Sequence, residues 1–440
     1  MNIHHSDFAM GQTNTVLVTL SLVRGQVETR DYPFDMKIMD LSNNALIEIK
    51  GFPPNLEILR CSGNSLPGFG GLPLSLKVLI CGSNTGSFSL EYLPPGLEKL
   101  VCCDTEILEL KNLPLGLKVL DCSYTDIIEL ELPSGLEELN CSYSSVTLKS
   151  FPPKLKVLHC SGTHNLEKKE FPESLEILSC EGNQLAEIKG LPSGLKELKC
   201  SHNELTKLEN LPNGLEILKC RNNMLSELKN LPSTLKTLKC RGNYLTKLEN
   251  LPTGLTNLDC SANNISCLTI LPPELLVLNC ETNSLTILEC NLPELSVLNC
   301  SNNLITRMEC SFPKLKQLIC HTNKLTKLEG LSSCLLRLVC GSNYLEELSG
   351  LPKGLEDLSC CRNPLKFIEP LPYRPGFYNF PSELVALHHP NNYSKYYQSY
   401  QTYFQHSNSL IVYMGLELEC PYPILEAVWH HIRKKWMNGV

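Results

Sequence analysis

Hydrophobic and polar residues follow a pattern that repeats about every 20 residues along most of the chain. The unit that begins at Leu191 has apolar residues at Leu195, Leu198, Cys200 and Leu205, with mostly polar residues between them. The alternation at Leu198 and Cys200 predicts a short strand with one buried face. A unit this short leaves no room for a full helix, and the Leu-Pro pair that opens it favours an extended, polyproline-like return segment.

Cysteine marks the register of these units. It recurs at a constant spacing from Cys160 through Cys180 and Cys200 to Cys360, and the upstream cysteines keep the same place with steps that deviate by no more than a single position. Leu41 takes this place in the first unit, which gives 17 units, 16 of them with cysteine, over residues 33–370. A unit this short cannot bury its own apolar face, so neighbouring units must stack.

The segment L-x-x-L-x-C-x-x-N-x-L matches the signature of leucine-rich repeats. We therefore predict a leucine-rich-repeat solenoid, a right-handed horseshoe without a break into two domains. A parallel β-sheet is expected on the concave face and an extended, polyproline-like chain on the convex side. Residues 1–32 and 371–440 do not repeat, and we expect them to cap the two ends of the solenoid.

The residue three places after each cysteine predicts how tightly the turns are joined. It is asparagine in 13 of 17 units, as at Asn203, and its amide can bond the backbone of its own and adjacent turns. Four consecutive units have a hydroxyl residue there instead: Thr105, Thr125, Ser144 and Thr163. Hydroxyl groups bond the backbone more weakly, so we expect looser turns and the weakest stretch of the solenoid over residues 102–166.

The 23 cysteines permit two interpretations. One is a row of inert buried thiols, since buried cysteine behaves as a small hydrophobic residue. The other is metal binding or redox sensing, but a zinc site needs convergent ligands, and parallel side chains suit a disulfide poorly. We expect inert free thiols, which favours a reducing, cytoplasmic compartment, including the cytoplasm of a host cell.

The two ends carry further predictions. The apolar stretch 15–23 lacks a preceding Lys/Arg region and a small-residue cleavage site, so we interpret it as part of a strand pair rather than a secretory signal. The pair would be Val16–Leu22 and Val27–Tyr32, turning at residues 24–26. No run approaches the roughly 18 apolar residues of a membrane span.

The C-terminal segment is rich in aromatic residues. Leu425, Trp429, Ile432 and Trp436 have helical spacing, which predicts a small helical cap on the last repeat. A protein-binding tail is the alternative. A zinc site is a third interpretation, although its residues match no familiar spacing: His388, His389, Cys420, His430 and His431.

Charge suggests where a partner would bind. Lys199, Lys219 and Lys239 lie between the core leucine and cysteine of three consecutive units, and Arg221 and Arg241 follow two residues later in the second and third. Like charges on adjacent strands destabilise a sheet, so an acidic partner could reduce the repulsion between these cations. The bordering acidic residues Glu181, Glu197 and Asp259 could neutralise part of the charge. A solvated charged face is the alternative interpretation.

The short repeats that begin with Leu-Pro resemble the LPX-type leucine-rich repeats of effector proteins from Gram-negative pathogens. The segment Leu198-Lys-Cys200-Ser-His-Asn203 also resembles uncharacterised leucine-rich-repeat proteins of large DNA viruses and amoebae. Some bacterial relatives carry a ubiquitin-ligase domain after the repeats. Here the segment 371–440 is too short for that domain, and Cys420 lacks the catalytic motif of that family, so the resemblance does not extend to ligase activity.

These observations favour a non-enzymatic protein-binding scaffold or adaptor that binds its partner through the concave face. An effector-type ubiquitin ligase, or another enzyme that uses the C-terminal segment, is the alternative. The expected partner is a protein with an acidic surface. Nucleic acid and membrane partners are not expected, because the net charge is −7 and no aromatic residue lies among the clustered cations. No cofactor or metal is expected, and the oligomeric state is open.

Overall fold

A computed structural model describes residues 18–19, 26–28, 35–85, 88–148, 150–163, 170–368 and 377–379. The chain divides into two compact units, Met1–Leu384 and Val385–Val440, and all of the described residues belong to the first. The predicted C-terminal helix, the aromatic tail and the hypothetical zinc residues therefore lie outside the described residues. No helix in the described ranges is both long and apolar enough to cross a membrane.

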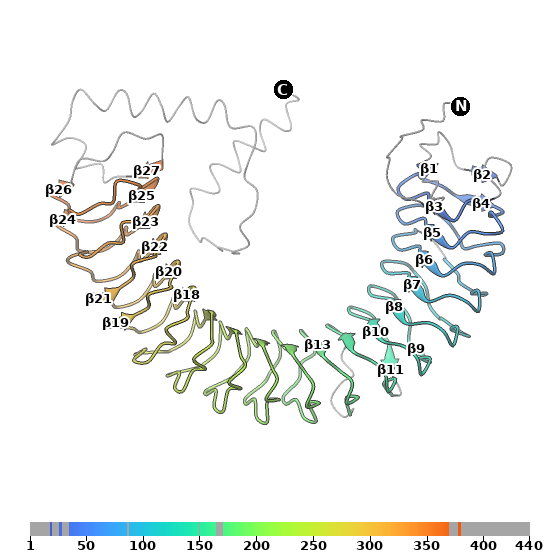
Figure 1. Cartoon of the computed structure of the whole chain (residues 1–440), viewed down its shortest axis with the longest axis horizontal. Coiled ribbons are helices and arrows are strands. Elements are labelled where there is room, and N and C mark those ends of the chain that lie inside the picture. Colours follow the sequence, from blue (N-terminus) through green and yellow to red (C-terminus); the bar gives the residue numbers. More distant parts are fainter. Residues whose placement is uncertain are drawn as a thin grey trace, which may run out of the picture. The chain divides into compact units, whose positions relative to one another are not determined.

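The described residues form a solenoid built on one 19-stranded parallel sheet (Figure 1). Each of the 17 predicted repeats contributes one strand to this sheet. In spatial order the strands are β1 (Val18–Thr19), β3 (Ile38–Asp40), β5 (Ile58–Arg60), β6 (Val78–Ile80), β7 (Lys99–Val101), β8 (Val119–Asp121), β10 (Glu138–Asn140), β12 (Val157–His159), β13 (Ile177–Ser179), β14 (Glu197–Lys199), β15 (Ile217–Lys219), β16 (Thr237–Lys239), β17 (Asn257–Asp259), β18 (Val277–Asn279), β20 (Val297–Asn299), β22 (Gln317–Ile319), β23 (Arg337–Val339), β25 (Asp357–Ser359) and β27 (Phe377–Asn379).

Four two-stranded parallel sheets join neighbouring turns elsewhere in the unit. Their strands are β2 (Gln26–Glu28) with β4 (Glu48–Lys50), β9 (Glu129–Leu130) with β11 (Thr147–Leu148), β19 (Ile287–Asn291) with β21 (Arg307–Ser311), and β24 (Glu347–Leu348) with β26 (Phe367–Ile368). The rest of each described turn is extended chain and tight turns, which agrees with the prediction that so short a unit leaves no room for a helix.

The main sheet continues through the stretch that the sequence marked as weakest. Strands β7, β8, β10, β12 and β13 pair one after another in unbroken register, although two of the repeats there are shortened by a single position. Residues 164–169 of that stretch lie outside the described residues. The prediction of a continuous repeat sheet is confirmed, while the handedness and curvature of the solenoid stay predictions.

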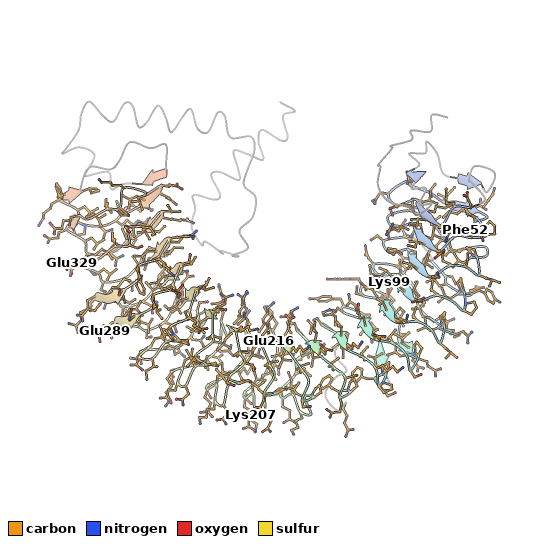
Figure 2. The ribbon with its side chains drawn as sticks, in the orientation of Figure 1. Phe52, Lys99, Lys207, Glu216, Glu289 and Glu329 are labelled. Atoms are coloured by element: carbon orange, nitrogen blue, oxygen red, sulfur yellow. The ribbon has the colours of Figure 1, made fainter. Side chains whose placement is uncertain are left out.

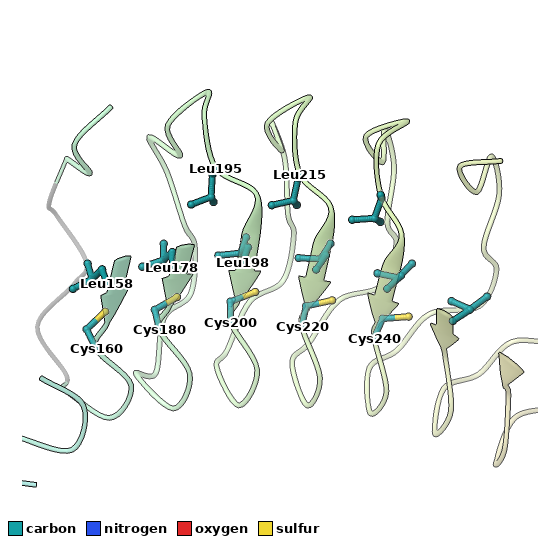
Figure 3. Packing of buried hydrophobic residues seen from close by; sticks show 14 of the residues in the cluster. Leu158, Cys160, Leu178, Cys180, Leu195, Leu198, Cys200, Leu215, Cys220 and Cys240 are labelled. Atoms are coloured by element: carbon teal, nitrogen blue, oxygen red, sulfur yellow. The ribbon is translucent and has the colours of Figure 1, made fainter. Parts of the chain in front are cut away.

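The core consists of leucine and cysteine side chains stacked in rows. Leu198 and Cys200 are fully buried, whereas Lys199 between them is half-buried on the outer face. Figure 3 shows the cysteine side chains of successive strands in a row beside the row of leucines. All 16 cysteines at this position are buried, as the alternation predicted. We call this row the cysteine ladder.

Asparagine side chains tie each turn to the turn before it. The Asn203 amide donates to the Cys180 and Cys200 carbonyls, and its Oδ1 accepts from the backbone N–H of Asn183 and of Leu185. The hydroxyl residues of the weak stretch form fewer hydrogen bonds. Thr105, Thr125 and Ser144 each donate one bond, to the cysteine carbonyl three residues earlier in the same turn. The side-chain link between turns is therefore weaker there.

The predicted N-terminal strand pair is wrong. Strand β1 pairs with β3, Val18 opposite Met39, and β2 pairs with β4 in a separate sheet. Each of the two strands therefore pairs in parallel with a strand of the first repeat, and they do not pair with each other. This pairing extends the same parallel arrangement that joins the repeats. At the other end β27 pairs with β25, with Tyr378 opposite Leu358. Both predicted caps therefore contribute one strand to the main sheet, and their boundaries stay predictions.

Candidate binding site on the sheet

The predicted cationic residues lie together on the outer face of the main sheet. Lys199, Lys219 and Lys239 are the last residues of β14, β15 and β16, and they are directly opposite one another in the ladder. Asp259 of β17 is the next residue along this row. Arg221 and Arg241 follow the second and third lysine by two residues. We call these five cations the basic cluster.

Two carboxylates neutralise part of the basic cluster. The Lys199 Nζ lies 3.1 Å from Glu197 Oε1, and the Lys219 Nζ lies 3.8 Å from the same oxygen. Arg221 reaches past strand β16 and places its Nη2 2.7 Å from Asp259 Oδ2. Of the three acidic residues that the sequence suggested, Glu197 and Asp259 therefore act as expected. Glu181 forms no ion pair among the described residues.

Two members of the basic cluster have no carboxylate as an ion-pair partner among the described residues. Within the described part of the chain, neither Lys239 nor Arg241 has an ion-pair partner within 4 Å, and the Arg221 Nε is buried without a hydrogen-bond partner. Burial lowers the pKa of Lys239, as do the nearby charges of Arg221 and Lys219, while Asp259 opposes them. The charged form of Lys239 is therefore disfavoured unless an anion binds beside it.

A second charge pattern, which the sequence analysis did not identify, runs alongside the sheet. The residue just before each strand alternates between lysine and glutamate over eleven successive turns, which we call the charge ladder: Lys37, Glu57, Lys77, Glu98, Lys118, Glu137, Lys156, Glu176, Lys196, Glu216 and Lys236. Ion pairs join neighbouring turns: Lys37–Glu57 (2.8 Å), Lys77–Glu57 (2.8 Å), Lys118–Glu98 (2.7 Å), Lys156–Glu137 (2.7 Å), Lys196–Glu176 (2.6 Å) and Lys236–Glu216 (2.7 Å). Opposite charges at this spacing nearly cancel, in contrast to the basic cluster.

The charge ladder leads to a pH prediction at Glu57. Its hydrogen bonds with Lys37 and Lys77 lower the pKa of Glu57 from 4.5 to about 2. A carboxyl group whose pKa is lower in the folded chain stabilises the fold above its unfolded pKa, and this stabilisation is lost as the pH falls from about 4.5 towards 2. Carbon-detected NMR titration should give a midpoint near 2 for Glu57, and Lys77→Gln should raise it. An ordinary midpoint in the unmodified chain would contradict this assignment.

The cysteine ladder offers little reactive chemistry. Burial raises the pKa of the Cys220 thiol to about 12, and the same cause raises the pKa of Cys200 and Cys240 well above its usual value. Thiols in this state are poor nucleophiles and poor metal ligands. Among the residues that the structure describes, no three His, Cys, Asp or Glu side chains converge as metal ligands would.

Several solved structures of bacterial proteins have a similar fold. YopM from Yersinia enterocolitica WA-314 is 28% identical, with a TM-score of 0.67, and the match covers 81% of this chain and 91% of that one. YopM from Yersinia pestis, a leucine-rich effector protein, is 29% identical, with a TM-score of 0.56 and coverage of 78% and 88%. The functional domain of InlJ from Listeria monocytogenes, which includes a cysteine ladder, is 24% identical, with a TM-score of 0.58 and coverage of 66% and 69%.

No protein-family model and no curated protein matches the sequence. The strand register, the leucine rows and the structural likeness together define the class: the chain is a leucine-rich-repeat solenoid. Its resemblance to YopM extends over most of both chains.

Proposed function

We propose that the chain is a non-enzymatic protein-binding scaffold or adaptor that binds an acidic protein surface through the basic cluster. The observation that carries this proposal is the charge imbalance on the sheet, where five cations over three turns have only two carboxylates as ion-pair partners among the described residues. A carboxylate from a partner would supply the missing counter-charge to Lys239 and Arg241. It would also stabilise the charged form of Lys239, which burial disfavours.

A protein partner fits this surface better than a nucleic acid. Glu197 and Asp259 lie within the basic cluster and would repel a phosphate backbone, and the net charge of the chain is −7. An acidic protein can place its carboxylates beside the two free cations and leave the existing ion pairs intact. The buried thiols of the cysteine ladder favour a reducing compartment, so we propose that the partner is cytoplasmic.

Affinity capture with the immobilised full chain tests this proposal. The triple variant Lys199→Ser, Lys219→Ser and Lys239→Ser should lose the partner that the unmodified chain retains. Partner binding to the unmodified chain should also weaken with salt more steeply than any residual binding to the variant. The matched control removes three lysines from the opposite side of the solenoid: Lys207, Lys247 and Lys327 (Figure 2 labels Lys207).

The control triple variant should retain the partner, because the change in net charge is the same while the basic cluster is intact. Equal retention by both triple variants would show that the basic cluster is only a solvated face. Equal loss would show that net charge, rather than this site, controls binding. Circular dichroism of each variant confirms that the fold is preserved before binding is compared.

A further inference from the structure

Two cysteines outside the cysteine ladder lie opposite each other on neighbouring turns. They belong to β19 and β21, whose strands run for five residues and pair in register, with Cys290 directly opposite Cys310. Figure 2 labels Glu289, the residue beside Cys290, on the side of the solenoid away from the main sheet. The Cys290 Sγ lies 3.4 Å from the Cys310 Sγ.

The sequence explains why a strand forms there. In many turns the residue before the apolar residue that opens the next unit has a left-handed conformation, as at Asn210 (φ 54°), Asn250 (φ 53°) and Gly330 (φ 66°). The equivalent residues Asn291 and Ser311 do not, and they continue the strands. The two turns therefore stay extended and paired through this region, which places the two thiols side by side.

These two thiols differ from those of the cysteine ladder in burial and in lying within 3.4 Å of each other. Cys290 and Cys310 are half-buried and so accessible to small reagents, whereas the ladder cysteines are buried. Ladder thiols such as Cys102 and Cys160 donate to a backbone carbonyl of the next turn, and Cys310 likewise donates to the Leu288 carbonyl, 3.0 Å away, in the preceding turn. The hydrogen bond from Cys290 lowers the pKa of Cys310, against the opposing effects of burial and of neighbouring carboxylates. That hydrogen bond also raises the pKa of Cys290.

We propose that Cys290 and Cys310 form an oxidisable dithiol that a low-molecular-weight disulfide, such as oxidised glutathione, converts into a disulfide between neighbouring turns. Adjacent strands lie about 4.7–4.9 Å apart, within the roughly 4.4–6.8 Å between Cα atoms that a disulfide spans. Parallel side chains make the bond strained, and strained disulfides are easily reduced. The modification is therefore reversible.

The thiol–disulfide exchange takes place in two steps. The Cys310 thiolate attacks one sulfur of the oxidised glutathione, so a mixed disulfide forms and one glutathione thiolate leaves. Cys290 then gives its proton to a thiolate in solution and attacks the Cys310 sulfur, which releases the second glutathione. Two protein thiols are oxidised, and one glutathione disulfide is reduced to two glutathione molecules.

Thiol mapping by mass spectrometry tests the proposal on the folded full chain. After treatment with oxidised glutathione, acid quenching and alkylation, the digest should contain one cross-linked peptide pair joining Cys290 to Cys310. Dithiothreitol should remove the cross-link. Cys290→Ser should leave one glutathione on Cys310, because no second thiol releases it, and Cys310→Ser should leave Cys290 in the thiol form.

The matched control is Cys267→Ser, which removes an exposed cysteine from a different turn and should leave the cross-link unchanged. The proposal is overturned if glutathione stays on Cys310 in the unmodified chain without a cross-link. It is equally overturned if Cys290 and Cys310 are no more reactive than the ladder cysteines. Neither result depends on the proposed partner or on the basic cluster.

Discussion

Asn223→Ala is expected to destabilise the solenoid by about 3–5 kcal/mol, since each buried polar group left without a partner costs roughly 1–3 kcal/mol. The Asn223 amide donates to the Cys200 and Cys220 carbonyls, and its Oδ1 accepts from the Leu205 N–H. Alanine can satisfy none of these groups, and two of them belong to the preceding turn. Urea unfolding followed by circular dichroism measures the loss.

Thr125→Ala is the matched comparison, because Thr125 occupies the same position in the weak stretch. It donates one hydrogen bond, to the Cys122 carbonyl of its own turn, so its removal should cost about 1 kcal/mol. Equal losses for the two variants would contradict the inference that the Asn223 side chain joins neighbouring turns and the Thr125 side chain does not. A normal transition for Asn223→Ala would contradict it as well.

Lys239→Glu is expected to change stability and binding in opposite directions. A carboxylate at this position lies near Arg221 and Lys219, whose charges outweigh that of Asp259 opposite, so the fold should gain up to about 1 kcal/mol at low salt, the usual limit for a partly exposed ion pair. Partner binding should weaken at least 10-fold, or about 1.4 kcal/mol, because the free cation is replaced by an anion. Thermal unfolding at low and high salt and a binding titration measure the two effects.

Lys247→Glu is the control for this charge reversal. Lys247 occupies the same position in its repeat as Lys207, which lies on the side of the solenoid away from the main sheet (Figure 2), and its Nζ is 2.9 Å from Glu249 Oε1. The reversal there should slightly destabilise the fold and leave binding unchanged. If Lys239→Glu destabilised the fold to the same degree, the basic cluster would carry no excess positive charge, and the proposed function would lose its main support.

The repeated features of this fold could be predicted from the sequence because each one recurs at the same place in successive units. The buried cysteine row, the sheet register and the asparagine bonds depend on contacts between equivalent positions, so one unit describes them all. The adjacency of Lys199, Lys219 and Lys239 followed from the same register. The charge ladder was equally readable in the sequence, but it lies just before the strands, outside the alternation of leucine and cysteine that defines them.

Features that break the periodicity could not be predicted in this way. The ion pair of Arg221 with Asp259 spans two turns, and a long side chain can choose among several nearby carboxylates. The sequence suggested a local pair of strands, Val16–Leu22 and Val27–Tyr32, whereas β1 and β2 pair with strands formed by later residues. The contact of Cys290 with Cys310 depends on strands that continue where most units turn.

Site-specific photo-crosslinking tests the central claim, that the outer face of the main sheet binds an acidic protein, most directly. A benzoylphenylalanine at Asn257, which lies on that face beside Thr237 of the neighbouring strand, reports contacts around the basic cluster without changing its charges. The same group at Lys247 reports the opposite side of the solenoid. We predict that the captured partner crosslinks through position 257, within its acidic surface, and not through position 247. A crosslink through position 247 alone would contradict the claim.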